Sequence, residues 1–141
     1  MRLFAFIVPL ASALLALANT PTAQVTYDPI YDDPNLSLNL VACSNGPNGL
    51  ITKGFTTLGS LPKFPYIGGS SSVAGWNSPS CGGCWSLTHN NKTIFVTAVD
   101  HAASGFNIAL TAMNELTDGH AVEFGKIFAV ISQADKSKCG F

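Results

Sequence analysis

The stretch WSLTHNNKTIFVTAV, residues 85–99, carries the clearest structural pattern in this sequence. Two segments, Trp85–His89 and Thr93–Val99, flank the polar turn HNNK at 89–92. Short segments rich in β-branched and aromatic residues on either side of an asparagine turn predict a β-hairpin. The second segment is almost wholly apolar, so we expect its strand to be buried on both faces.

Outward from this hairpin, three further segments have the pattern of strands. VTYDPIY, from Val25 to Tyr31, and LSLNLVAC, from Leu36 to Cys43, alternate apolar and polar residues in part. KIFAVISQ, from Lys126 to Gln133, predicts a final buried strand. Several short strands with long loops and little helix are typical of a small closed β-barrel, so we expect a mainly β fold.

Helix is expected in one place only. Leu110 to Leu116 predicts a short helix, which the residues Thr117, Asp118 and Gly119 bring to an end. Residues 54–83 are rich in glycine, proline and serine, and they predict long ordered loops with a short helical turn at most.

The N-terminal segment has the layout of a secretory signal peptide. Residues 1–18, MRLFAFIVPLASALLALA, place one cation at Arg2 before an apolar run and end with Ala16 and Ala18 at A-x-A spacing. An uncleaved anchor is the alternative, but Pro9 and Ser12 interrupt the run, which is shorter than the ~20 residues that cross a bilayer. We therefore expect a signal peptide at 1–18 and a secreted domain at 19–141.

Composition limits the classes of function. With 47% apolar and 10% aromatic residues the chain can bury a core, and its length suits one domain. The formal net charge of -1 lacks the basic excess that phosphate backbones require, so we expect no nucleic-acid partner. No segment after the leader can cross a membrane, so no integral membrane association is expected.

Four cysteines, an even number in a secreted chain, favour two disulfides. Cys81 and Cys84 form a CxxC, but their flanks lack the strand-to-helix entry of a redox site. The three histidines stand alone, so four zinc ligands cannot be assembled, and we expect neither metal nor cofactor. All three pairings of the cysteines remain open at this point. The four are Cys43, Cys81, Cys84 and Cys139.

Five ordered blocks resemble the cerato-platanin family of small secreted fungal proteins: VTYDPIY, VACSNGPNGL, TLGSLPKFP, AGWNSPSCGGCW and VDHAASGFNIAL, followed by Cys139. The resemblance covers residues 25–141 and implies a six-stranded double-psi β-barrel similar to the first domain of expansins. It also implies disulfides Cys43–Cys81 and Cys84–Cys139. Members of the family are described as binding chitin oligomers, loosening polysaccharide networks without cutting them, assembling at surfaces and eliciting plant defence.

Asp100 is the best candidate for a functional carboxylate. It ends a strongly apolar strand, where a carboxylate must find hydrogen bonds or shift its pKa. It can instead be a turn residue that accepts N–H bonds from the AASG segment that follows. The resemblance favours a functional role, since Asp100 matches an aspartate that the family shares with the expansin groove. His101 is expected to be a bystander, because adjacent strand residues point to opposite faces.

Sugar recognition combines aromatic faces with planar amides and carboxylates. Besides Asp100, we expect the carbohydrate groove to include residues of the matched blocks, namely Tyr27, Asp28, Asn45, Asn77 and Asn107. Trp76 and Trp85 are interpreted instead as core residues, Trp76 packing near the disulfides.

Glycoside hydrolysis generally needs two carboxylates about 5–9.5 Å apart, and Asp100 has only Asp28 as a candidate partner. We therefore expect a non-enzymatic wall protein that binds chitin or N-acetylglucosamine oligomers, loosens polysaccharide and acts as an elicitor. Plant wall polysaccharide and a host receptor are further candidate partners, and the protein is expected to be monomeric or weakly self-assembling. Two alternatives remain: a surface-active elicitor with no functional sugar site, and a weak hydrolase that uses Asp100 and Asp28.

Overall fold

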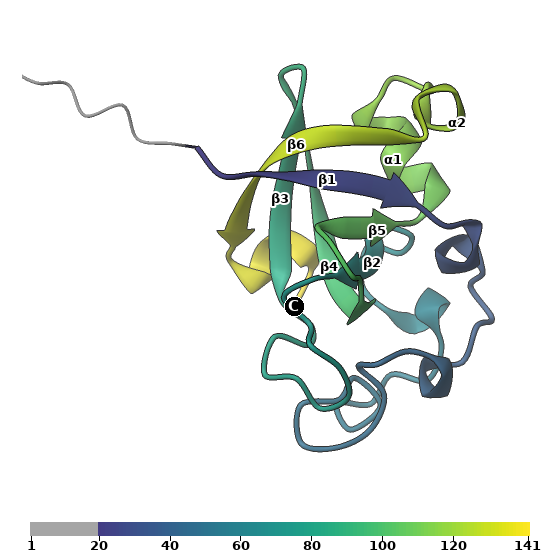
Figure 1. Ribbon diagram of the computed structural model, residues 1–141. Helices are drawn as coiled ribbons and strands as arrows, with labels where there is room; N and C mark the ends of the chain where they lie inside the picture. The colour runs from purple at the N-terminus through teal and green to yellow at the C-terminus, as the bar shows by residue number, and fades with distance from the viewer. Residues whose placement is uncertain (1–19) are drawn as a thin grey trace, which may run out of the picture.

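The computed structural model describes residues 20–141, which fold as a closed barrel of six strands in the order β1-β5-β2-β4-β3-β6 (Figure 1). The expected six-stranded barrel with short helices and long loops is therefore confirmed. The predicted signal peptide at 1–18 lies outside the described residues. The strands are β1 (Thr22–Tyr27), β2 (Ile67–Ser70), β3 (Cys84–His89), β4 (Lys92–His101), β5 (Phe106–Ile108) and β6 (Lys126–Ala134).

The predicted hairpin is confirmed as the antiparallel pair β3 and β4. Its turn consists of Asn90 and Asn91, whose φ angles are 46° and 63°. Two successive left-handed residues match the twist of the flanking strands, and asparagine adopts this conformation at low cost. Elsewhere the barrel contains two parallel pairs, β1 with β5 and β2 with β4.

The core fills the barrel and continues beneath α1 (Leu110–Leu116). The helix occupies the residues expected and buries Ala112, Met113 and Leu116. Thr117 ends it by donating its hydroxyl to the Met113 carbonyl at 2.7 Å, and Asp118 and Gly119 follow with positive φ. The predicted helix and its stop signal are both confirmed.

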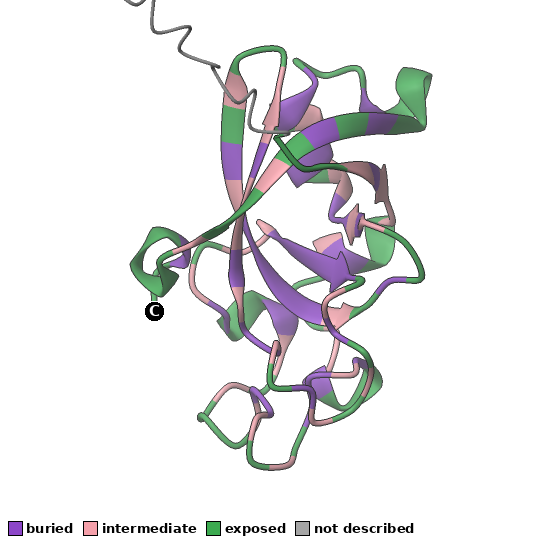
Figure 2. Ribbon diagram, turned by 60° about the vertical axis from the view of Figure 1, so that its left-hand side comes forward, coloured by how far each residue is buried: buried purple, intermediate pink, exposed green. Residues whose placement is uncertain are grey.

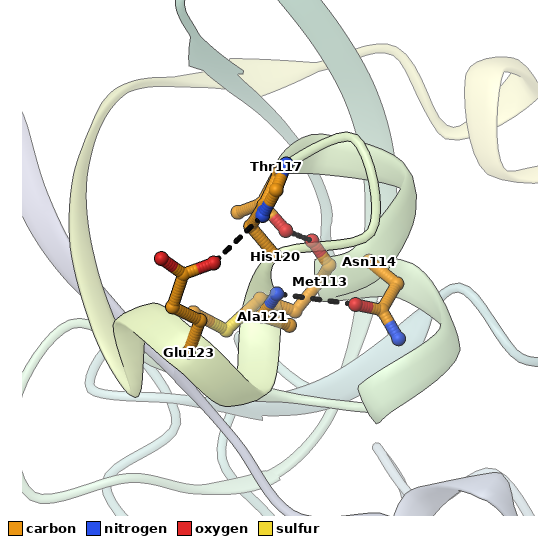
Figure 3. Close-up of polar contacts among 6 residues, drawn as sticks. All are labelled: Met113, Asn114, Thr117, His120, Ala121 and Glu123. Atoms are coloured by element: carbon orange, nitrogen blue, oxygen red, sulfur yellow. Dashed lines mark hydrogen bonds and ion pairs between the residues drawn. The ribbon is translucent and has the colours of Figure 1, made fainter.

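A second short helix, α2 (Ala121–Phe124), was not expected from the sequence. Figure 3 shows how the two helices are joined: the Asn114 side-chain oxygen accepts a bond from the Ala121 backbone nitrogen at 3.1 Å. His120 Nδ1 lies 2.8 Å from Glu123 Oε2 on the exposed side. The position of α2 therefore depends on single polar side chains at the helix ends. The spacing of apolar residues in the sequence does not predict such contacts.

The strand predicted from Leu36 to Cys43 is wrong. This segment is a loop with a single 3-10 turn at Leu38–Leu40, which Ser37 caps by accepting from the Asn39 nitrogen. Leu38 is fully buried, whereas the Leu40 side chain is 72% exposed. The apparent alternation therefore reflects one anchoring leucine and a local serine cap that competes with strand pairing.

The strand predicted from Val25 to Tyr31 ends at Tyr27. Proline at 29 has no N–H to donate to a strand partner, and Asp28 caps the 3-10 turn Pro29–Asp32 by accepting from the Ile30 nitrogen at 3.0 Å. The turn carries Tyr31 inward, where it is buried. This early exit from the strand places Tyr31 beside the end of β4.

The final strand is confirmed in position but is not fully buried as expected. Ile127 and Ala129 face the core, while Phe128 and Val130 face outward, and Phe128 is 64% exposed. Figure 2 shows buried and exposed colours alternating along this strand. The strand lies between β1 and β3 in a sheet whose outer face is open, so only alternate residues are covered.

The disulfides join Cys43 to Cys81 and Cys84 to Cys139, with Cα–Cα distances of 5.4 and 5.8 Å. The pairing implied by the family resemblance is confirmed, and the CxxC cysteines each pair outward. Residues 54–83 form the expected long loops with one 3-10 turn, but they also contribute the short strand β2. None of the helices in residues 20–141 is long and apolar enough to span a membrane.

Candidate functional site

The Asp100 carboxylate receives three hydrogen bonds at the end of β4. Oδ1 accepts from the backbone nitrogens of Ala42 and His101 at 2.9 and 2.8 Å, and Oδ2 accepts from the Tyr31 hydroxyl at 2.9 Å. Two of these donors are 58 and 69 residues away in sequence. The alternative in which Asp100 accepts from backbone N–H groups of the following AASG segment is therefore wrong. A carboxylate has about four acceptor positions, so one remains unused on this partly buried side chain.

Tyr31 is held as a neutral donor to Asp100. Burial raises the pKa of its phenol above the ordinary value of 10.0, and the negative charge of Asp100, its hydrogen bond and the more distant charge of Asp28 raise it further. The phenol therefore stays protonated near neutral pH and donates. Asp28 contributes to this electrostatic environment, but its own Oδ1 caps the turn that follows β1.

This arrangement predicts a loss of stability in alkali. The folded chain retains the Tyr31 proton to a higher pH than the unfolded chain, so the free energy of unfolding is unaffected below about pH 10 and falls as the pH rises beyond it. Urea unfolding between about pH 9 and about pH 11 measures this slope. In Tyr31→Phe the slope should be reduced, and an unchanged slope would contradict the assignment.

The barrel register places Asn107 close to Asp100. Thr26 pairs with Asn107, Asn107 with Gly69, and Gly69 with Asp100, which makes one row across β1, β5, β2 and β4. Paired residues of neighbouring strands point to the same face. The Asn107 side-chain oxygen accepts from the Thr26 hydroxyl at 3.0 Å, which orients the amide on this face. The space that a side chain at Gly69 would occupy is filled by the His101 carbonyl oxygen and the Ala102 methyl group, which lie 2.9 and 3.4 Å from an ideal Cβ position.

A second cluster lies in the loops below the barrel (Figure 1). The Trp76 indole nitrogen donates to Asn45 Oδ1 at 2.7 Å, and its ring is 62% exposed. Asn77 Oδ1 accepts from the Asn48 nitrogen at 2.9 Å. Trp76 is therefore not the core residue that the sequence suggested, because its flanking glycine and asparagine hold it in a surface loop and not in a strand.

Two loop segments connect this cluster to Asp100. The first begins at Ala42, whose nitrogen binds Asp100, and reaches Asn45. The second begins at Val73, whose carbonyl lies 2.6 Å from His101 Nδ1, and reaches Trp76. Three residues span at most ~10 Å, so the Asn45 backbone lies within about that distance of Ala42, and the Trp76 backbone within about that distance of Val73. His101 thus fixes a loop, and its imidazole makes no contact with the Asp100 carboxylate.

The other expected residues are placed less directly. Tyr27 pairs with Ile108 and is half-buried against the core, and no hydrogen bond joins its side chain to Asp100 within residues 20–141. Trp85 packs edge-on against Phe106 at 5.5 Å, in agreement with a core role. Sequence reasoning placed Tyr31 and Trp76 outside the preferred set, although both were aromatic residues in matched blocks.

Three pockets on the described surface have volumes of about 260, 240 and 150 Å³. None of these three is lined by Asp100 or Trp76, so both clusters lie outside them. The pocket of about 260 Å³ is lined by Trp85, Gln133 and Lys136, among others. Within residues 20–141, no group of three histidine, cysteine or acidic side chains is arranged to hold a metal ion.

Comparisons with known proteins agree on one family. A family model described as cerato-platanin matches residues 23–141. The "Heat-stable 19 kDa antigen" of Coccidioides posadasii (strain RMSCC 757 / Silveira) is 50% identical over 136 residues, which are 96% of this chain and 91% of that protein.

Solved structures give the same result. Cerato-platanin 3 from M. perniciosa is similar with a TM-score of 0.83 at 46% identity, covering 86% of this chain and 100% of that one. The solution structure of the fungal elicitor Cerato-Platanin has a TM-score of 0.72 at 40% identity, covering 82% and 95%.

Proposed function

This chain belongs to the cerato-platanin family, and on that premise we propose that it is a secreted protein that binds chitin-type N-acetylglucosamine oligomers without hydrolysing them. The observation that carries the proposal is that two short loop segments run from the surroundings of the partly buried Asp100 carboxylate to the exposed indole of Trp76. An aromatic face suits the apolar side of a sugar ring, and a carboxylate suits its hydroxyls. Asn107 lies in the same row as Asp100 and supplies an amide.

Two features support binding over hydrolysis. Both Asp100 oxygens accept hydrogen bonds from donors, so the group is engaged as an acceptor and not as a proton donor. Asp28, its one candidate partner, uses Oδ1 to cap a turn. A glycosidase needs one acid and one base or nucleophile across the sugar. Release of reducing sugars from chitin would therefore favour the hydrolase alternative and count against this proposal.

Secretion and elicitor activity are part of the same proposal. The two disulfides suit an oxidising compartment, and a similar solved structure is described as a fungal elicitor. Loosening of wall polysaccharide would follow if a sugar chain bound to Asp100 and Trp76 can no longer contact its neighbours.

We expect Trp76→Ala to lower retention on insoluble chitin by roughly tenfold. The stacking of a planar ring on an aromatic side chain contributes ~1–3 kcal/mol where nucleic-acid bases are bound, and we expect a sugar ring on Trp76 to gain a similar amount. The measurement is a pull-down with displacement by soluble N-acetylglucosamine oligomers. The matched control is Phe128→Ala, which removes an equally exposed ring from β6 and should leave retention unchanged. Equal losses in both variants would show non-specific adsorption.

A specific observation favours the surface-active alternative. Exposed apolar side chains follow one another along α2 and the outer face of β6, and exposed patches of this kind promote assembly at interfaces. They are Val122, Phe124, Phe128 and Val130. The test compares the unsubstituted protein with Phe128→Ala. If the substitution abolishes coating of an air–water interface, and chitin retains neither of the two proteins, the function is adsorption and the proposed sugar site has no role.

A further inference from the structure

A pocket of about 260 Å³ opens at one end of β3 and β6, and neither Asp100 nor Trp76 lines it. Trp85 lies two residues before the buried Leu87, and Gln133 continues the inward series of Ile127 and Ala129 on β6. Trp85 and Gln133 are paired across β3 and β6. Trp85 is partly buried and Gln133 is exposed, so the pair lies where the barrel interior meets solvent, and barrel mouths are frequent ligand sites.

The pocket rim comes from the loop before β3 and from the helical turn that follows β6. Its volume of about 260 Å³ is below the ~300–1,000 Å³ of sites for drug-sized ligands, so it suits one sugar ring. The lining residues are Pro79, Ser80, Gly83, Cys84, Trp85, Gln133, Ala134 and Lys136. A methyl group at Gly83 would lie 3.7 Å from the Trp85 indole nitrogen, so the glycine leaves that nitrogen open.

Polar groups in this pocket are available to a ligand. The indole nitrogen of Trp85 and the side-chain amide of Gln133 make no hydrogen bond to any atom of residues 20–141. Donors and acceptors at a pocket wall bind water or ligand when the protein offers no partner. Together with an aromatic ring they provide the usual chemistry of a sugar subsite.

Positive charge borders the pocket on one side. Lys136 lines the pocket. The Lys53 ammonium lies close to the pocket wall, 3.6 Å from an ideal Cβ position on Gly82, which precedes the lining residue Gly83. No carboxylate of residues 20–141 lies within 4.0 Å of either ammonium group. Partial burial, followed by the charge of Lys136, lowers the pKa of Lys53, which agrees with two cations close together and without an anion.

We propose that this pocket binds one uronic-acid unit of an acidic polysaccharide. The apolar face of the sugar ring lies against Trp85, Gln133 and Ser80 bond its hydroxyls, and Lys136 with Lys53 binds its carboxylate. An anion relieves the repulsion between the two ammonium groups, whereas a neutral chitin unit leaves it in place. A free phosphate would use the lysines but not the indole or the amide.

The test uses the two tryptophans of the chain, Trp76 and Trp85, as separate reporters. Their indole N–H signals in a ¹⁵N correlation spectrum are assigned with Trp76→Phe. Titration with trigalacturonate should move the Trp85 signal, and titration with an N-acetylglucosamine oligomer should move the Trp76 signal. The methyl ester of trigalacturonate, inorganic phosphate and a sulfated galactoside complete the set of probes.

We expect Lys136→Gln to weaken trigalacturonate binding about tenfold, and Lys53→Gln combined with it to weaken binding further. The matched control is Lys126→Gln, the same charge change at the other end of β6. Asp100→Asn should leave trigalacturonate binding intact, so a failure of the chitin site does not affect this result. A sulfated galactoside that binds as well as trigalacturonate would assign the site to anionic sugars in general and overturn the preference for uronate.

Three further outcomes would overturn the proposal. Equal binding of the methyl ester would show that the lysines do not recognise the carboxylate. An equal loss in Lys126→Gln would show long-range attraction without a site. A shift of the Trp85 signal with phosphate alone, as large as with trigalacturonate, would show an anion site that does not recognise sugar.

Discussion

The free energy of unfolding should fall by about 4 kcal/mol when Cys43 and Cys81 are both replaced by serine, because this disulfide closes a loop of 38 residues. Replacing Cys84 and Cys139, 55 residues apart, should cost about the same, since the entropy of loop closure varies only slowly with length. A domain of this size is stable by ~5–15 kcal/mol, so either change removes a large part of its stability. Urea unfolding of both variants measures the loss.

The two disulfide variants should also differ in function if they remain folded. Cys43 and Cys81 tie together the loop segments that carry Asn45 and Trp76, so their loss should weaken chitin retention. Cys84 lines the pocket proposed to bind a uronic acid, so the loss of its disulfide should weaken trigalacturonate binding instead. Variants that lose both activities in parallel would show that each disulfide stabilises the whole domain without positioning a particular site.

Local sequence signals identified those parts of the fold that local interactions determine. The hairpin follows from two asparagines that accept positive φ, and α1 follows from its apolar spacing and the threonine and glycine that end it. The prediction of a strand at 36–43 was wrong, because one buried leucine beside a serine cap gives the same alternation of apolar and polar residues as a strand. β2 and β5 are too short to show any periodicity, since they have four and three residues.

The candidate site was only partly predictable, because the residues that form it are far apart in the sequence. Asp100 stands out as a carboxylate at the end of an apolar strand, but its partners Ala42 and Tyr31 are 58 and 69 residues away. Trp76 was misread because a tryptophan near cysteines is usually buried. Its exposure depends on a hydrogen bond to Asn45, 31 residues away. The family resemblance favoured a functional role for Asp100 and implied the disulfide pairing, but it gave no indication of these contacts.

Asp100→Ala is expected to lower the free energy of unfolding by roughly 3 kcal/mol and to abolish retention on chitin. The substitution leaves the buried Tyr31 hydroxyl and the Ala42 nitrogen without an acceptor, and each unsatisfied group costs about 1–3 kcal/mol. It also removes the acceptor proposed for the sugar hydroxyls. Urea unfolding and chitin pull-down on the same preparations separate the two effects.

Two further variants decide which effect controls binding. Asp100→Asn keeps the shape and one acceptor oxygen, so it should recover part of the stability while retention stays low. Asp33→Ala is the matched control, since Asp33 accepts a single backbone N–H, from Asn35 at 2.9 Å, and is exposed. It should cost about 1 kcal/mol and leave retention unchanged. If Asp100→Asn retains full chitin binding, the carboxylate only supports the loops, and the sugar must be recognised through Trp76 and its neighbours alone.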